Sequence, residues 1–188
     1  MTREKELKMR LLARAVEVKA LKFGTFVLSS GKESRFYFDG RLLSLDPEGI
    51  TLIATLFLKE FASSHSNFVG GPTLGADPIV SAITVLSYTS THLVSGFLVR
   101  RHKKKYGTGN QIEGHLLKDA RVIVVDDTCT TGKNLLASIN VIEERGAKVV
   151  KVLVVLDRNE GGSAAIKKEG FDFGSLLTVK DNEVVLSD

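Results

Sequence analysis

The sequence has very little cysteine: Cys129 is the only one among its 188 residues. A single cysteine excludes an intramolecular disulfide framework, so nothing in the chain requires an oxidising compartment. Segment 1–21 has no uninterrupted apolar run, because charged side chains recur throughout it. It therefore matches neither a signal peptide nor a membrane span, and we expect a cytoplasmic protein without a membrane partner.

The chain also lacks a strong charge of one sign. Its 26 basic and 22 acidic residues leave a net charge of +4, which could attract nucleic acid, an anionic membrane or a phosphorylated metabolite. No helix-turn-helix or RNA-binding motif is present, so we expect no nucleic-acid partner. No Cys/His cluster has metal-ligand spacing, so we expect no metal held by protein ligands alone. The length and the 43% hydrophobic content predict one domain over residues 1–188.

Helical periodicity and capping signals predict four helices. Leu7, Leu11 and Val16 recur at helical spacing, which predicts a helix over about 4–21 that ends at Lys22–Gly24. Asp46–Pro47 and Asp77–Pro78 each combine a capping Asp with a Pro suited to the first turn, which predicts helices over roughly 47–63 and 78–90. A fourth helical pattern covers 131–145, and Gly146 stands where a helix end needs a positive φ.

Short apolar runs between these helices indicate buried strands. They lie at Phe68–Val69, Gly96–Val99, Val122–Val125 and Val149–Leu156. Unbroken β-branched runs are typical of strands covered on both faces. We therefore predict an α/β fold with a mostly parallel central sheet flanked by helices, in which the last two runs form a βαβ unit.

The segment VIVVDDTCTTGKN, residues 122–134, places two carboxylates and several small hydroxyl residues at the end of a predicted strand. In open α/β sheets ligands bind at that edge, and a helix N-terminus just beyond it favours a phosphate. A triphosphate loop would need Gly five residues before its Gly-Lys pair and Ser or Thr after it, and Asp127 and Asn134 occupy those positions. The pattern predicts a cradle for a single phosphate, against the alternative of a solvated turn whose threonines only cap the helix.

This segment resembles the signature of the type I phosphoribosyltransferases, continuously from Val122 to Gly132. The resemblance implies catalytic roles for Asp126 and Asp127, which would accept hydrogen bonds from ribose hydroxyls and favour an oxocarbenium ion. It also implies a set of residues that bind phosphoribosyl pyrophosphate: Asp126, Asp127, Thr128, Cys129, Thr130, Thr131, Gly132, Lys133 and Asn134.

Two further segments resemble orotate phosphoribosyltransferases. Residues 21–49 are similar to the N-terminal hood of that family, which would occupy 1–45 here. Its Phe36 and Phe38 could stack on a planar ring, whereas residue type alone favours a strand with alternating core aromatics. Val155–Gly162 resembles the orotate-binding turn, in which Arg158 offers a fork suited to a carboxylate. The resemblance assigns orotate binding to Thr130 and Arg158, whereas the residues alone also allow a surface ion pair between Arg158 and Glu160.

Leu98–Gly114 resembles the catalytic loop of the same family. Matched by position, Arg100, Arg101, Lys104 and Tyr106 would bind phosphoribosyl pyrophosphate, with Lys104 supporting the departing pyrophosphate and Tyr106 standing where histidine is common. The long stretch 101–118 lacks apolar periodicity, so we expect a mobile catalytic loop. Residue type alone fits a solvated loop equally well. The family loop closes over a neighbouring subunit, which implies a homodimer with shared active sites.

Val69–Pro78 resembles the pyrophosphate loop of the family, with Gly75 and Ala76 where some members carry a lysine. The implied reaction transfers ribose 5-phosphate from phosphoribosyl pyrophosphate to N1 of orotate in pyrimidine biosynthesis. Mg²⁺ would arrive with the pyrophosphate and touch protein mainly through water. Two alternatives remain: a regulator of the same fold that binds nucleic acid, and a purine phosphoribosyltransferase, whose substrates lack the carboxylate that Arg158 suits.

Overall fold

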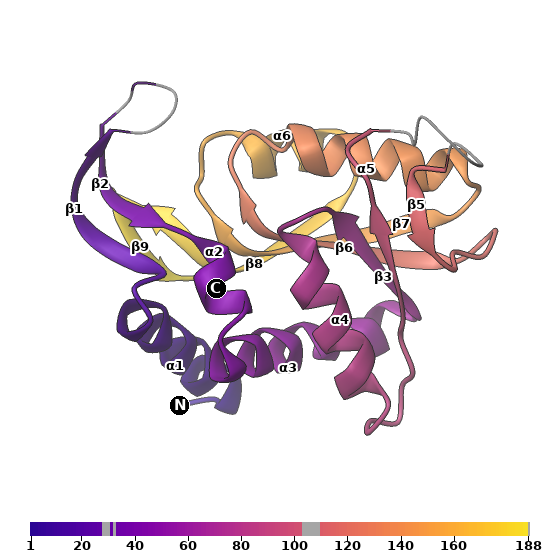
Figure 1. Cartoon of the computed structure of the whole chain (residues 1–188), viewed down its shortest axis with the longest axis horizontal. Coiled ribbons are helices and arrows are strands. Elements are labelled where there is room, and N and C mark those ends of the chain that lie inside the picture. The colour runs from indigo at the N-terminus through magenta and orange to yellow at the C-terminus, as the bar shows by residue number, and fades with distance from the viewer. Residues whose placement is uncertain (28–30, 32, 103–109, 188) are drawn as a thin grey trace.

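A computed structural model describes residues 1–27, 31, 33–102 and 110–187. In that part of the chain the central sheet is built from β3 Phe68–Pro72, β4 Ser95–Val99, β5 Ile112–Gly114, β6 Arg121–Cys129, β7 Lys148–Asp157, β8 Asp172–Lys180 and β9 Glu183–Leu186. The strand order is β5-β4-β3-β6-β7-β8-β9 (Figure 1). Strands β4, β3, β6, β7 and β8 run parallel, and β5 and β9 pair antiparallel at the two edges. The predicted mostly parallel sheet is confirmed.

Helices cover both faces of this sheet. Helices α1 Arg3–Glu17, α3 Pro47–Ser64 and α4 Ala76–Ser87 lie on one face, and α5 Lys133–Glu144 and α6 Gly162–Lys168 lie on the other (Figure 1). Each face has its own apolar core, with fully buried Ile53 and Phe57 on the first and Leu135 and Ile139 on the second. Within the described ranges no helix is long and apolar enough to cross a membrane.

The predicted crossover is confirmed: β6, α5 and β7 follow one another, and β6 pairs parallel with β7. Helix α5 is followed by Gly146 at φ 81°, as its position required. Asp46 caps helix α3: its carboxylate accepts the Gly49 amide at 2.8 Å, so that predicted cap is also confirmed. The sequence signals succeed here because each is local to its helix end.

Two predicted helix limits are wrong. Helix α1 ends at Glu17 rather than near residue 21, because Lys19 takes a left-handed conformation at φ 60° and Leu21 enters a strand. Helix α4 begins at Ala76, and Asp77 lies inside its first turn instead of capping it. The residue at the cap position is Gly75, already near helical φ and ψ at −60° and −38°, so the helical turn starts before the acid.

The N-terminal hairpin forms a small sheet of its own. Strands β1 Leu21–Val27 and β2 Glu33–Phe38 pair antiparallel, and the short helix α2 Gly40–Ser44 follows them. The amide of Asp39 bonds the carbonyl of Ala20 at 2.8 Å, which closes the base of the hairpin. Helix α2 contacts β6, so the hairpin leads the chain directly to the carboxyl end of the central sheet.

Part of the predicted loop over 101–118 is regular structure. Residues 112–114 form β5, which pairs antiparallel with β4 and extends the sheet at its edge. The pairing places Ile112 in the core at 8% exposure. This burial was not predicted, because the stretch around Ile112 has so few apolar residues. Residues 103–109 lie outside the described part of the chain.

Candidate active site

Two adjacent cavities lie at the carboxyl ends of β3 and β6. The first encloses about 350 Å³ between α2, the β3–α4 loop and the end of β6, and the second about 200 Å³ over the start of α5. Both are lined by Asp126, Thr128 and Asn134, so they form one continuous site. This is the edge at which ligands of open α/β sheets bind.

The phosphate loop surrounds the second cavity. It runs from the end of β6 through Gly132, which precedes α5 in a left-handed conformation at φ 74°. Among the residues that the structure describes, no side chain caps the start of α5, so the amides of its first turn have no side-chain acceptor there. Free amides and the positive end of the helix dipole both favour an anion, so the phosphate cradle stays a prediction that this geometry suits. The residues that line it are Asp126, Thr128, Cys129, Thr130, Thr131, Gly132, Lys133, Asn134 and Leu135.

Cys129 contributes to this loop through its backbone. Its side chain is only 1% exposed, and burial raises the pKa of its thiol to about 12. Its carbonyl accepts the amide of Arg158 at 2.9 Å, and the neighbouring carbonyl of Thr130 accepts the amide of Gly162 at 3.0 Å. Two backbone hydrogen bonds therefore join the phosphate loop to the turn between β7 and α6.

Asp126 lines both cavities, and Asp127 lines the first. Asp126 is 8% exposed, and its Oδ1 accepts the amide of Asp127 at 2.9 Å. Burial, and secondarily the charge of Asp127, raises the pKa of the Asp126 carboxyl well above its ordinary range. Burial also raises the pKa of Asp127. Ionising two adjacent buried carboxyls costs free energy, and a positively charged partner would lower that cost.

Two glycines make room for these carboxylates. A Cβ at Gly40 would lie 2.7 Å from Oδ2 of Asp127, and one at Gly75 would lie 2.8 Å from Oδ1 of the same residue. Neither position accepts a side chain without displacing the acid. Gly75 follows the cis peptide between Thr73 and Leu74 in the segment that resembles a pyrophosphate loop.

Arg158 lies beside the phosphate loop and under the hairpin. Its side chain is 11% exposed, and its guanidinium carbon lies 5.0 Å from the centroid of the Phe36 ring. Its Nε bonds Glu160 at 2.7 Å, so the ion pair considered from the sequence does form. The remaining guanidinium nitrogens have no protein partner among the described residues. Phe36 and Arg158, predicted separately, therefore meet at a third cavity of about 380 Å³.

The structure does not bring every predicted residue to this site. Arg100 follows β4, where it pairs with Glu113 at 3.2 Å, and exposed Arg101 follows it. Neither lines the cavities around Asp126. Lys104 and Tyr106 lie outside the described residues. The sequence interpretation in turn missed Asp39, Gly40 and Arg41, which line the first cavity; their only signal was their position directly after an aromatic strand.

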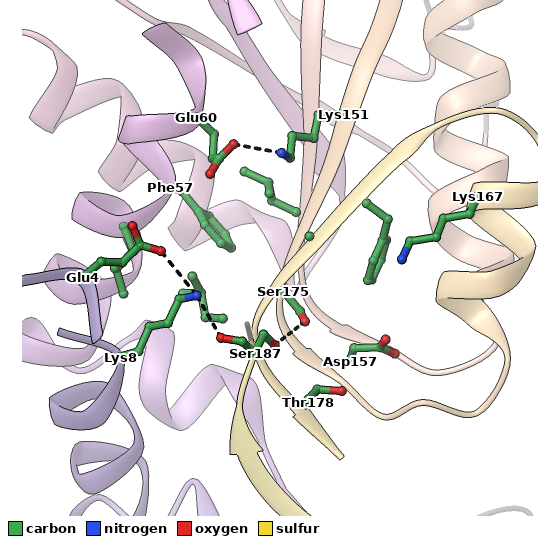
Figure 2. Close-up of a pocket in the computed structure, with 15 residues that line it drawn as sticks. Glu4, Lys8, Phe57, Glu60, Lys151, Asp157, Lys167, Ser175, Thr178 and Ser187 are labelled. Atoms are coloured by element: carbon green, nitrogen blue, oxygen red, sulfur yellow. Dashed lines mark hydrogen bonds and ion pairs between the residues drawn. The ribbon is translucent and has the colours of Figure 1, made fainter. Parts of the chain in front are cut away.

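A further cavity of about 410 Å³ lies away from this site, between α1, α3 and the strands β7 and β8 (Figure 2). Four of the charged side chains that line it, Glu4, Lys8, Glu60 and Lys151, are in ion pairs. Lys151 bonds Glu60 at 2.9 Å and Asp172 at 3.0 Å, and Lys8 bonds Glu4 at 3.3 Å. Paired charges leave little attraction for a ligand, so the carboxyl edge of the sheet is the better candidate.

Comparison with known proteins agrees with this geometry. The model of the phosphoribosyl transferase domain family matches residues 78–177. The orotate phosphoribosyltransferase of Methanosphaera stadtmanae is 38% identical over 94% of this chain and 96% of its own length. That of Pyrococcus furiosus is 39% identical over 93% and 94%. The chain belongs to the orotate phosphoribosyltransferase family.

Solved structures support the same family. Orotate phosphoribosyltransferase of Mycobacterium tuberculosis, in complex with Fe(III) dicitrate, superposes with a TM-score of 0.81 at 34% identity, covering 94% of this chain and 98% of that one. A complex of the same enzyme with phosphoribosyl pyrophosphate gives 0.76 at 32% identity over the same shares. The predicted pentosyltransferase activity, which makes orotidine 5′-monophosphate from orotate and phosphoribosyl pyrophosphate, is confirmed by these full-length relatives. The regulator and the purine enzyme are set aside.

Proposed function

We propose the following division of labour within this orotate phosphoribosyltransferase. The amides and hydroxyls from Thr128 to Gly132 hold the 5-phosphate at the start of α5, together with Lys133 and Asn134. Asp126 and Asp127 accept hydrogen bonds from the ribose hydroxyls. Arg158, with Thr130 beside it, binds the orotate carboxylate through the guanidinium nitrogens that Glu160 leaves free.

One observation carries this assignment: the two backbone hydrogen bonds between the phosphate loop and the Arg158 turn. They fix the expected anion site and the expected carboxylate fork on adjoining loops. Ribose 5-phosphate held at the first would present its anomeric carbon toward a base held at the second. Holding two reactants in that relation lowers the entropic cost of the reaction.

In the transition state, opposite charges develop on the two sides of the breaking C1–O bond, and the enzyme must stabilise both. The ribose ring becomes positive as the C1–O bond opens, and the bond electrons leave with pyrophosphate while orotate N1 attacks. Asp126 and Asp127, close to the ribose, offset the positive charge. Because only charge that develops in the transition state accelerates the step, these carboxylates contribute mainly to kcat.

We propose that Mg²⁺ enters this site with the pyrophosphate. Two carboxylates beside an open cavity suit a hard cation that keeps several waters and takes one or two acidic ligands. In the described ranges no group of three or more His, Cys, Asp or Glu residues could hold a metal by itself. When bound, Mg²⁺ would supply positive charge to the leaving group, and Asp126 and Asp127 would hold its waters.

We also propose a homodimer with shared sites, in which Lys104, Arg100, Arg101 and Tyr106 serve the pyrophosphate of the partner subunit. The supporting observations are that Arg100 and Arg101 stay away from the carboxylates of their own chain, and that apolar side chains are exposed on and after α4. Val85 is 70% exposed, Tyr88 82% and Leu93 64%. Several exposed apolar side chains close together indicate an interaction surface.

The base assignment is tested with two variants, Arg158→Ala and Arg158→Lys. Each is assayed with phosphoribosyl pyrophosphate, Mg²⁺ and a panel of bases while pyrophosphate release is followed. Losing a buried carboxylate partner costs about 2 kcal/mol or more, so Arg158→Ala should raise the KM for orotate roughly thirtyfold or more. Lysine should recover little because it lacks the fork. Glu160→Gln, which removes only the ion pair, is the matched control. An equal loss for orotate and phosphoribosyl pyrophosphate would reject the assignment.

A further inference from the structure

The first cavity contains one basic side chain within the described part of the chain. Arg41 lines it together with Asp39, Asp126, Asp127 and the backbone around Gly75. The β3–α4 segment itself supplies no cation, since Gly75 and Ala76 stand where a lysine could. Pyrophosphate in this cavity would therefore meet three carboxylates and one guanidinium.

The backbone below Arg41 is held in place. Gly40 packs so tightly on Asp127 that a Cβ there would lie 2.7 Å from the Cβ of the acid. The amide and Nε of Arg41 both bond Oδ1 of Asp39, at 3.1 and 3.2 Å. Asp39 is in turn bonded through its amide to Ala20. The start of the Arg41 side chain is thus anchored on the same element that contacts the catalytic carboxylates.

The far end of the side chain is free. Among the described residues the guanidinium of Arg41 bonds only Asp39 and only through Nε, which leaves both Nη groups available. The side chain is 56% exposed at the cavity. Its charge reaches Asp127: burial raises the pKa of that carboxyl, and the nearby guanidinium partly offsets the rise. An anchored base with an unused fork is arranged to receive a phosphate oxygen.

We propose that Arg41 binds the pyrophosphate group of phosphoribosyl pyrophosphate from within the same subunit, in place of a cation from the β3–α4 loop. The inference rests on the proposed positions of the 5-phosphate and the ribose. As the C1–O bond breaks, its electron pair moves to the pyrophosphate oxygen and the contact with Arg41 strengthens. Arg41 keeps its protons throughout, because a guanidinium does not release them at neutral pH.

The test compares Arg41→Gln, Arg41→Lys and the parent by calorimetric titration with pyrophosphate, phosphoribosyl pyrophosphate and ribose 5-phosphate, each with Mg²⁺. Losing one charge-assisted contact should weaken pyrophosphate and phosphoribosyl pyrophosphate roughly tenfold to hundredfold in the glutamine variant and lower kcat. Ribose 5-phosphate, which lacks the leaving group, should bind within about twofold of the parent. Lysine should restore part of the loss because it restores the charge.

Arg3→Ala is the charge-matched control, since Arg3 is exposed on α1 and lines neither cavity around Asp126. Parental pyrophosphate affinity in Arg41→Gln would overturn the proposal. An equal loss for ribose 5-phosphate would overturn it too, by showing that Arg41 only holds Asp127 in place. Failure of the parent to bind ribose 5-phosphate would instead reject the phosphate-loop assignment. Thermal unfolding of each variant confirms that the fold compared is the same.

Discussion

Replacing Gly162 by alanine tests whether the phosphate loop depends on the turn packed against it. A Cβ at this position would lie 2.6 Å from both the Cys129 sulfur and the Thr130 carbonyl oxygen, and 2.7 Å from the Gly132 nitrogen. Two of these atoms belong to the backbone, so a change of side-chain rotamer cannot relieve the contact. The turn and the loop must therefore separate by several tenths of an ångström.

The expected magnitudes follow from that geometry. Overpacking of this kind costs about 1–3 kcal/mol. In a chain of this length the melting temperature falls about 2–4 °C per kcal/mol, so Gly162→Ala should lower it by roughly 2–12 °C. A displacement approaching 1 Å at a substrate-positioning loop costs up to about a hundredfold in rate. We therefore expect a large fall in kcat/KM for phosphoribosyl pyrophosphate, measured beside calorimetric unfolding.

Gly170→Ala is the control that separates stability from positioning. Gly170 has a left-handed φ of 90° with no atom within 4 Å of an added Cβ, and it lies beyond α6, away from the loop. Its replacement should cost about 1–2 kcal/mol of backbone strain and leave kcat/KM unchanged. Parental stability and parental kcat/KM in Gly162→Ala would refute the reasoning, as would an equal fall in kcat/KM in the control.

Two further predictions concern the carboxylates and the shared site. Because burial raises the folded-state pKa of Asp126 above its unfolded value, the stability this group contributes is present below that unfolded value, about 4, and is lost as pH rises toward the folded one. Asp126→Asn should therefore be inactive, and its melting temperature relative to the parent should rise as the pH is raised from 4 to 8. A difference in melting temperature that stays constant across that range would contradict the buried-charge explanation. Mixing inactive Lys104→Ala with inactive Asp126→Ala/Asp127→Ala should restore roughly a quarter of the parental rate when half the dimers are mixed; no recovery, with subunit exchange shown by native mass spectrometry, would exclude shared sites.

The phosphate loop could be predicted from sequence because its determinants are consecutive. The apolar run of β6, the two acids, the hydroxyl residues and Gly132 each carry a local signal, and together they fix a strand, a turn and a helix start. The resemblance to a known family then supplied the substrate. The mostly parallel direction of the strands followed from the same alternation of runs and helices, whereas the strand order was not predicted.

What could not be predicted depends on contacts between distant residues. The pairing of Leu21 with Phe38 decides that α1 ends at Glu17, since apolar residues near position 21 fit a helix equally well. The contact between Phe36 and Arg158 joins segments more than a hundred residues apart. Arg41 offered no periodicity or motif of its own. The positions of such side chains depend on the tertiary fold, so no local sequence pattern predicts them.

The hydrogen bonds between the phosphate loop and the Arg158 turn also matter for engineering a different base preference. A library that varies the turn freely would disturb the amides of Arg158 and Gly162, and with them the carbonyls of Cys129 and Thr130. Most of its members would lose the common donor substrate before any new base could be selected. Diversity confined to the side chains of residues 158–160, with Gly162 and Cys129 held constant, would let selection act on the acceptor alone.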